Sequence, residues 1–225
     1  IQDCAHSLGS KYKNESVAKY SDASCYSFYP TKNITTIEGG AICTNKKKLF
    51  LFAKNYINNG MNKNYRDRSK NLKFWDYDIV ALGQKLHMTN IQDTLGLQQL
   101  KNFKYMQKKR NENQNLYLKK INNKKVFLLN NFSNNKISSY HLTSLITKKS
   151  EDRNKLLLYL KKNKVICSVH YKPINKMSYF KKILSKSNKK FSNAENFYKK
   201  SLSLPNYPDL RKKDLYKICR LINDF

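Results

Sequence analysis

Two short apolar segments and one amphipathic segment occupy the first half of the chain. Residues 24–29 and 40–44 are short runs of apolar and small residues, and both are predicted as strands. Over 46–58 the apolar residues recur at helical spacing, which predicts a helix. Because short strands that alternate with helices are typical of α/β proteins, we predict an α/β architecture. The apolar face of the predicted helix carries Leu49, Phe52, Ala53 and Tyr56.

A long helix is predicted to begin at residue 89. Thr89 and Gln92 stand three positions apart, as in a capping box, where each side chain accepts a hydrogen bond from the other residue's backbone N–H. We expect this helix to connect two domains, 1–110 and 111–225. Apolar residues continue along it at Leu95, Leu100, Phe103 and Met106.

The second half of the chain has the pattern of a small α+β domain. Ser192 and Glu195 form a second capping-box pattern, which predicts the start of a helix. The basic segment 181–190 is predicted as a loop. The other predicted elements are strands at 126–130, 138–146 and 165–170, and helices at 151–162 and 211–222.

Composition narrows the class of protein. Of the 225 residues, 40% are hydrophobic, so the chain can bury a core and is not a disordered basic tail. The longest apolar runs, such as 49–53, are far shorter than the ~20 residues that a membrane span needs, so no membrane partner is expected. The five cysteines include no Cys-x-x-Cys pair and no His at zinc spacing. They indicate reduced thiols, no metal site and a cytoplasmic location.

The formal net charge of +30 comes almost entirely from lysine. Surfaces that bind nucleic acid favour arginine, because its guanidinium makes bidentate contacts to phosphates and bases. We therefore interpret the excess as solvated lysine from A+T-rich coding drift, and expect no specific nucleic-acid partner. A nucleic-acid footprint stays the alternative, and it predicts lysines clustered on one face. Arginine occurs only at Arg66, Arg68, Arg110, Arg153, Arg211 and Arg220.

Glycine marks the N-terminal half as the part with special backbone geometry. All six glycines lie between Gly9 and Gly96, and glycine alone adopts some turns without strain. Three polar motifs stand in the same half. They are Asp3-Cys4-Ala5-His6, the segment from Ser27 to Lys32, and Glu38-Gly39-Gly40, which we predict as a tight turn returning the chain past Lys32.

These motifs, in this order and spacing, resemble those of the sugar aminotransferases of the DegT/DnrJ/EryC1/StrS family. The resemblance implies a type I pyridoxal 5′-phosphate (PLP) dependent transferase fold, like that of aspartate aminotransferase. Residues 1–110 would then be the C-terminal part of the PLP-binding large domain, and 111–225 the small α+β domain. The matching segments are Ile1–Ser10, Ser27–Ala41, Trp75–Leu100, Ser168–Pro173 and Ser203–Leu210.

The resemblance implies cofactor roles for four residues. Lys32 would form the Schiff base with PLP and then carry the proton during transfer. Asp3 would keep the pyridine nitrogen protonated, and His6 would lie beside the ring and its 3′-oxygen. Ser27 would donate its hydroxyl to the phosphate. The alternatives are a surface lysine, a turn carboxylate, a packed histidine and an ordinary strand serine.

One segment departs from the family pattern. Gln84-Lys85-Leu86-His87 stands where the family often has Tyr-Asn-Tyr-Arg, and that Asn usually reaches the neighbouring subunit's cofactor phosphate. A lysine can serve a phosphate as a point charge. We therefore expect Lys85 to bind the cofactor across a homodimer with shared active sites, while the role of His87 stays open.

The implied activity is transfer of an amino group from L-glutamate to a UDP- or dTDP-linked 4-keto-6-deoxy sugar. Ser168–Ile174 is most similar to the branch acting on UDP-4-keto-6-deoxy-N-acetylhexosamines. Because the chain opens at Ile1 inside a motif, we expect a fragment without the N-terminal part that carries further cofactor contacts. Two alternatives are a catalytically inactive relic acting as a basic binding protein, and a dehydratase. The dehydratase branch has His at the Schiff-base position, so Lys32 argues against it.

Overall fold

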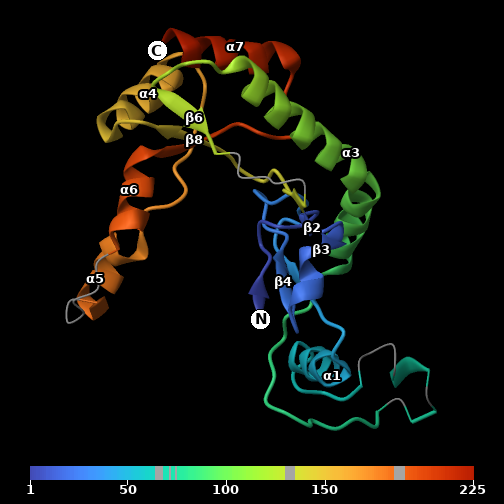
Figure 1. Ribbon diagram of the computed structural model, residues 1–225. Coiled ribbons are helices and arrows are strands. Elements are labelled where there is room, and N and C mark those ends of the chain that lie inside the picture. The colour runs from blue at the N-terminus through green and yellow to red at the C-terminus, as the bar shows by residue number, and fades with distance from the viewer. Residues whose placement is uncertain (64–67, 71, 74, 130–134, 185–190) are drawn as a thin grey trace. The chain divides into compact units, whose positions relative to one another are not determined.

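The computed structural model describes residues 1–63, 68–70, 72–73, 75–129, 135–184 and 191–225 (Figure 1). Two compact units make up the chain. The first comprises Ile1–Lys104 and Phe132–Ser139, and the second comprises Tyr105–Asn131 and Tyr140–Phe225. The predicted roles of 1–110 as a cofactor domain and 111–225 as a small domain stay predictions.

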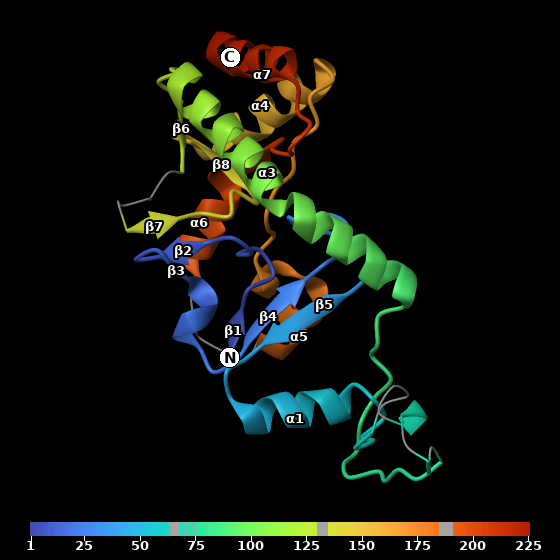
Figure 2. The same cartoon turned by 90° about the vertical axis from the view of Figure 1, so that its right-hand side faces the viewer.

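The first unit is built on a three-stranded sheet in the order β1-β4-β5, which Figure 2 shows side by side. Strand β1 (Gln2–Asp3) pairs in parallel with β4 (Ser24–Ser27), with Asp3 opposite Cys25. Strand β5 (Gly40–Cys43) pairs with β4 in antiparallel orientation. Both strands predicted from the sequence are therefore present, although each is shorter than its predicted segment.

A helix and a second small sheet complete the first unit. Helix α1 (Lys47–Tyr56) confirms the predicted helix, but its apolar face is covered only in part, and Phe52 is 58% exposed. The second sheet has the order β3-β2-β7. It is formed by β2 (Lys11–Tyr12), β3 (Glu15–Ser16) and β7 (Lys136–Ile137), and the 3-10 helix η1 (Val17–Tyr20) follows β3.

Helix α3 (Asn90–Lys120) supplies residues to both units. Its predicted capping box is confirmed. The Thr89 hydroxyl oxygen accepts from the Gln92 backbone N–H at 3.3 Å, and Gln92 Oε1 accepts from the Thr89 N–H at 2.7 Å. These bonds satisfy two backbone groups that the start of a helix would otherwise leave unpaired.

The second unit packs helices on an antiparallel sheet of order β6-β8-β9, formed by Val126–Leu128, Thr143–Thr147 and Ser201–Leu204. Its helices are α4 (Ser150–Lys162), α5 (Ser178–Leu184), α6 (Ser192–Lys200) and α7 (Lys212–Asp224), with a 3-10 turn η2 at Ile174–Lys176. Apolar residues from the sheet and from α3, α4 and α7 form the core. Its most buried members include Tyr117, Leu145, Leu156, Leu160, Leu202 and Ile222.

Two strand predictions in the second unit are wrong in part. The segment 165–170 makes only a single bridge, between Ser168 and Ser203. Its first residue, Val165, instead donates its backbone N–H to Leu160 at the end of α4. The predicted strand 138–146 begins only at Thr143, because its first part, to Ser139, belongs to the first unit.

Two further predictions in this unit are wrong in part. Residues of the predicted loop 181–190 lie in helix α5 as far as Leu184, and 185–190 lie outside the described residues. Helix α6 begins at Ser192 as predicted, but the capping box there does not form. Its Glu195 side chain instead accepts from Asn175 Nδ2 at 2.9 Å and pairs with Lys176 at 3.1 Å. A partner elsewhere in the fold has therefore displaced the local cap.

All five cysteines are free thiols, with Cys4 and Cys219 buried and Cys43 exposed. Burial raises the pKa of Cys167 to about 12 and that of Cys219 to about 11. No helix in the described part of the chain is long and apolar enough to cross a membrane. Among the described residues, no three His, Cys, Asp or Glu side chains gather as metal ligands would.

Candidate active site

Four of the predicted site residues lie at one edge of the β1-β4-β5 sheet. Asp3 ends β1 and Ser27 ends β4. Because these strands run in parallel, their carboxyl ends meet at the same edge, where ligands bind in open α/β sheets. His6 and Lys32 lie on the loops that leave those two ends. The fold therefore brings together residues that are far apart in the sequence.

Asp3 is an exposed carboxylate held by its own turn. Its Oδ1 accepts a hydrogen bond from the Ala5 backbone N–H at 2.9 Å, an Asx turn that fixes the side chain. Its second oxygen, Oδ2, forms no hydrogen bond with any residue that the structure describes. A carboxylate oriented in this way can accept a hydrogen bond from a ligand N–H.

Ser27 is half-buried at the end of β4, and its hydroxyl is available as a donor. Its Oγ accepts from the Tyr29 backbone N–H at 3.3 Å, which uses a lone pair, and no described residue accepts the hydroxyl hydrogen. Ser27 pairs with Gly40 across the ladder. A Cβ on Gly40 would lie 2.6 Å from the Tyr26 carbonyl oxygen, so only glycine allows this close approach of β5.

Lys32 lies in the loop between β4 and β5, in a turn closed by its backbone N–H to the Tyr29 carbonyl at 2.9 Å. The sequence suggests a residue at a strand end, whereas Lys32 follows the last residue of β4 by five positions. Its side chain is half-buried. Across the described residues, its ammonium group forms no hydrogen bond and no ion pair. An amine without a carboxylate partner can react with a ligand carbonyl once it loses its proton.

Hydrogen bonds hold both ends of the loop that carries Lys32. Phe28 donates its backbone N–H to Gly39 at 2.9 Å, and Thr36 donates its own to Phe28 at 2.9 Å. Gln92, from the capping box of α3, donates through Nε2 to the Glu38 carbonyl at 2.9 Å. The loop therefore has fixed ends. Gly39 has φ +149°, and a Cβ there would lie 2.4 Å from the Thr36 hydroxyl oxygen, which supports the predicted tight turn at 38–40.

His6 is half-buried, and its backbone is held from a distant part of the chain. Its carbonyl accepts a hydrogen bond from the Ser139 hydroxyl. The Ser139 carbonyl in turn accepts from Asn33 Nδ2 at 2.8 Å, and Asn33 is the residue directly after Lys32. The sequence motifs do not point to Asn33 or Ser139. Asn33 directly follows the motif from Ser27 to Lys32, but no local pattern places Ser139 beside it.

The structure places Lys85 elsewhere in the first unit. Its neighbours bond to the end of α1, with Gln84 N–H to Tyr56 at 2.7 Å and Leu86 N–H to Ile57 at 3.0 Å. Lys85 itself is exposed and bridges Asn58. It forms no hydrogen bond or ion pair with the four sheet-edge residues in the part of the chain that is described. Its predicted role across a subunit interface stays a prediction.

The two C-terminal motifs of the resemblance meet within the second unit. Ser168 pairs with Ser203 by two backbone hydrogen bonds, and His170 Nδ1 lies 2.8 Å from the Ser203 hydroxyl. Nearby, Arg110 is buried and donates to the Asn206 carbonyl, and burial lowers the pKa of its guanidinium. These contacts fix the segment that follows β9.

The donor set at the sheet edge fits pyridoxal phosphate. The ring nitrogen of PLP needs a carboxylate, and Asp3 has an oxygen without a hydrogen bond to the described residues. The phosphate needs hydrogen-bond donors, and the Ser27 hydroxyl is one. The aldehyde needs an amine, and Lys32 supplies one on the neighbouring loop. Each side chain thus matches one chemical group of the cofactor.

Comparisons with known sequences agree with this arrangement. A sequence profile of the DegT/DnrJ/EryC1/StrS aminotransferase family matches residues 1–223. The UDP-4-amino-4,6-dideoxy-N-acetyl-beta-L-altrosamine transaminase of Campylobacter jejuni serotype O:2 is 34% identical over 216 residues, 95% of this chain and 55% of that protein. An uncharacterized protein of Methanocaldococcus jannaschii is 31% identical over 225 residues, 99% of this chain and 58% of that protein. The chain therefore spans little more than half the length of these relatives.

Solved structures confirm the predicted type I fold. PseC of Helicobacter pylori, an aminotransferase involved in the biosynthesis of pseudoaminic acid, superposes with a TM-score of 0.88 at 29% identity, over 99% of this chain and 58% of PseC. The PMP-form of Spr1654 from Streptococcus pneumoniae, described as a sugar aminotransferase, gives a TM-score of 0.87 at 26% identity, over 99% and 57%. Its PLP-form and PMP-form indicate pyridoxal phosphate as the cofactor of such proteins.

Proposed function

Since the chain belongs to the DegT/DnrJ/EryC1/StrS aminotransferase family, we propose that it supplies the reacting lysine of a PLP-dependent nucleotide-sugar aminotransferase. The observation that carries the proposal is the sheet edge, where Asp3 and Ser27 end neighbouring parallel strands and Lys32 lies on the adjoining loop. The amino donor is L-glutamate. The acceptor is a UDP- or dTDP-linked 4-keto-6-deoxy sugar, and the named substrate of the Campylobacter jejuni relative favours a UDP-linked N-acetylhexosamine.

PLP, when bound, supplies an aldehyde that takes up amines and a ring that withdraws electrons from the reacting carbon. Asp3 Oδ2 would accept a hydrogen bond from the ring nitrogen and hold the proton there. Ser27 donates its hydroxyl hydrogen to the phosphate, which orients the ring. Lys32 would supply the amine for the cofactor aldehyde, and its Nζ would carry a proton to or from the reacting carbon. His6 would lie beside the ring.

We further propose a cytoplasmic homodimer with shared sites, in which Lys85 serves the phosphate bound by the partner subunit. An exposed lysine supports this role, since it can reach a group outside its own subunit. The backbone hydrogen bonds of Gln84 and Leu86 to the end of α1 hold the backbone of Lys85 in place. Five free thiols support a reducing compartment.

Borohydride trapping tests the proposal in the chain as it exists. The protein is incubated with PLP, reduced, digested, and analysed by peptide mass spectrometry, with a Lys32→Ala variant in parallel. We expect the added mass mainly on the peptide that contains Lys32, and no preferred site in the variant. Labelling spread evenly over the lysines of the wild-type chain would contradict the proposal, and would favour a relic that only binds anions.

A further inference from the structure

Asn33, the residue directly after Lys32, is almost fully buried, and its side-chain amide contacts two backbone carbonyl oxygens. Its Nδ2 donates to the Ser139 carbonyl at 2.8 Å and approaches the Leu8 carbonyl at 3.5 Å. Asn33 is 6% exposed and Ser139 is 3% exposed. A buried amide that bonds to backbone carbonyls cannot leave without exposing unpaired acceptors, so it holds the chain in one place.

Ser139 makes two further bonds to the loop that follows β1. Its backbone N–H donates to the Ser10 hydroxyl at 2.9 Å, and its own hydroxyl donates to the His6 carbonyl. The same strand segment pairs with that loop, since Lys11 lies opposite Ile137 in the β2-β7 ladder. One residue therefore joins the loop after β1 to the loop after β4, and each of those loops carries proposed cofactor ligands.

Beyond the ends of the strands, no ladder pairing joins the two loops in the part of the chain that is described. Strands β1 and β4 pair only as far as Asp3 and Cys25, and beyond them the chain follows turns. Turns that leave a sheet move more easily than the ladder itself. Without a link, the distance between Asp3 and Lys32 would vary with every movement of either loop.

We propose that Asn33 and Ser139 are positioning residues, which hold the Lys32 loop against the Asp3–His6 loop so that Lys32 meets the cofactor aldehyde. This inference rests on the proposed function. The network sets where Lys32 Nζ lies without touching the cofactor. A displacement of reacting groups by about 1 Å lowers rates by up to about 100-fold. The hydrogen bonds of Asn33 and Ser139 therefore govern the reactivity of the lysine.

The test compares Asn33→Ala and Ser139→Ala with a matched control at the other end of the same strands. Asn33→Ala removes the amide contacts with Ser139 and Leu8, whereas Ser139→Ala removes the hydroxyl bond to His6. The control is Thr44→Ala. Thr44 donates to the Asp22 carbonyl at 2.6 Å and accepts from the Lys46 N–H at 3.0 Å. Its loss also removes two hydrogen bonds.

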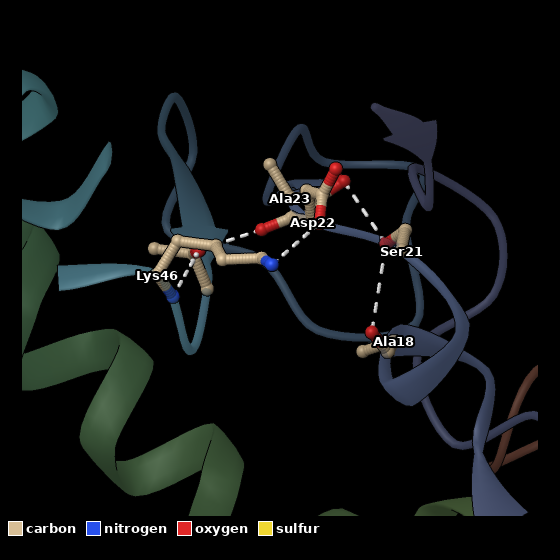
Figure 3. A network of polar contacts seen from close by, with 6 residues as sticks. Ala18, Ser21, Asp22, Ala23 and Lys46 are labelled. Atoms are coloured by element: carbon tan, nitrogen blue, oxygen red, sulfur yellow. Dashed lines mark hydrogen bonds and ion pairs between the residues drawn. The ribbon is translucent and has the colours of Figure 1, made fainter. Parts of the chain in front are cut away.

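Figure 3 shows the polar contacts at this control end, where Asp22 and Lys46 form an ion pair of 3.4 Å and Ser21 bonds to Ala18 and Ala23. It is the opposite end of the ladder from the candidate site. Ser24 pairs with Cys43 there, while Ser27 pairs with Gly40 at the site. Because Thr44 is less buried than Asn33, the losses of stability can differ, and the effect on the Lys32 loop is what distinguishes a positioning role.

Two readouts separate positioning from stability. The first is the ratio of PLP trapped on Lys32 to PLP trapped on all other lysines, and the second is hydrogen exchange of the amides of Lys32 and Thr36 without PLP. We expect Asn33→Ala to lower the trapping ratio by about tenfold or more and to speed exchange at both amides. Ser139→Ala should change both in the same direction by less, and Thr44→Ala should change neither.

Unchanged exchange in Asn33→Ala and Ser139→Ala would overturn the inference, whatever the trapping shows. A wild-type ratio well above one that both variants retain would also overturn it, while leaving the proposed function intact. A wild-type chain without any preference for Lys32 would instead remove the proposed function and this inference with it. If Asn33→Ala does not fold, the same comparisons are decided by Ser139→Ala alone.

Discussion

Replacing Asp3 separates its charge from its part in the local turn. Asp3 Oδ1 accepts the Ala5 N–H at 2.9 Å, and the amide oxygen of Asn can accept the same bond. We therefore expect Asp3→Asn to leave the free energy of unfolding unchanged. Asp3→Ala loses that acceptor, and we expect it to cost about 0.5–1.5 kcal/mol, the net value of one hydrogen bond.

The cofactor responds differently to the same two changes. Both remove the carboxylate proposed to hold the ring nitrogen, and a hydrogen bond to a charged group contributes about 1.5–3 kcal/mol. At about 1.4 kcal/mol per factor of ten, the dissociation constant for PLP should rise by about 10- to 100-fold in either variant. Absorbance titration of the chain with PLP measures this constant, and thermal unfolding measures the stability.

The matched control is Asp22→Asn. Asp22 is likewise an exposed aspartate of the first unit, but it lies at the other end of β4 and pairs with Lys46 at 3.4 Å (Figure 3). Its removal changes the net charge by the same amount. The reasoning fails if Asp3→Asn binds PLP with wild-type affinity, or if Asp22→Asn weakens binding as much as Asp3→Asn does.

Three other outcomes are expected. Lys85→Glu should weaken PLP binding by about 1–3 kcal/mol in a dimer, because it sets a carboxylate against a phosphate. Mixing Lys85→Glu protomers with Lys32→Ala protomers should restore part of the activity. No recovery of activity, although heterodimers form, would contradict shared sites. Tyr117→Phe removes the hydroxyl that donates to the Pro205 carbonyl at 2.8 Å, so denaturant unfolding should show a loss of about 1–3 kcal/mol; wild-type stability would contradict the account of that bond. Burial raises the pKa of Cys219 to about 11, so the thiol of the unfolded chain ionises first and the free energy of unfolding should fall between about pH 9 and 11. The free energy of unfolding of Cys219→Ala should fall less steeply over the same range, and an equal slope would refute the contribution of Cys219.

The elements predicted well are those whose signal is local. The apolar spacing over 46–58 predicts α1, and the Thr89 capping box predicts the start of α3, because both patterns act within one turn or one face of a helix. The same pattern fails at Ser192, where Asn175 and Lys176 bind Glu195 instead. Strand β9 was not predicted because its pairing with β8 depends on residues more than fifty positions away.

The candidate site divides in the same way. The resemblance to the family identifies Asp3, Ser27 and Lys32 as candidates, because their motifs stand in the family's order and spacing. Asn33 and Ser139 make no such local pattern, since their bond joins positions 106 residues apart. Lys85 could be named from its motif, but a role across a subunit interface depends on a second chain.

Amino-group transfer to the cofactor tests the central claim most directly. The chain is loaded with PLP and given L-glutamate labelled with nitrogen-15, and the label in pyridoxamine phosphate is followed by mass spectrometry against free PLP. The account predicts labelling about 100-fold faster than with free PLP, the scale of general acid–base catalysis, and a return to the free rate in Lys32→Ala. Labelling by Lys32→Ala at the wild-type rate would contradict it.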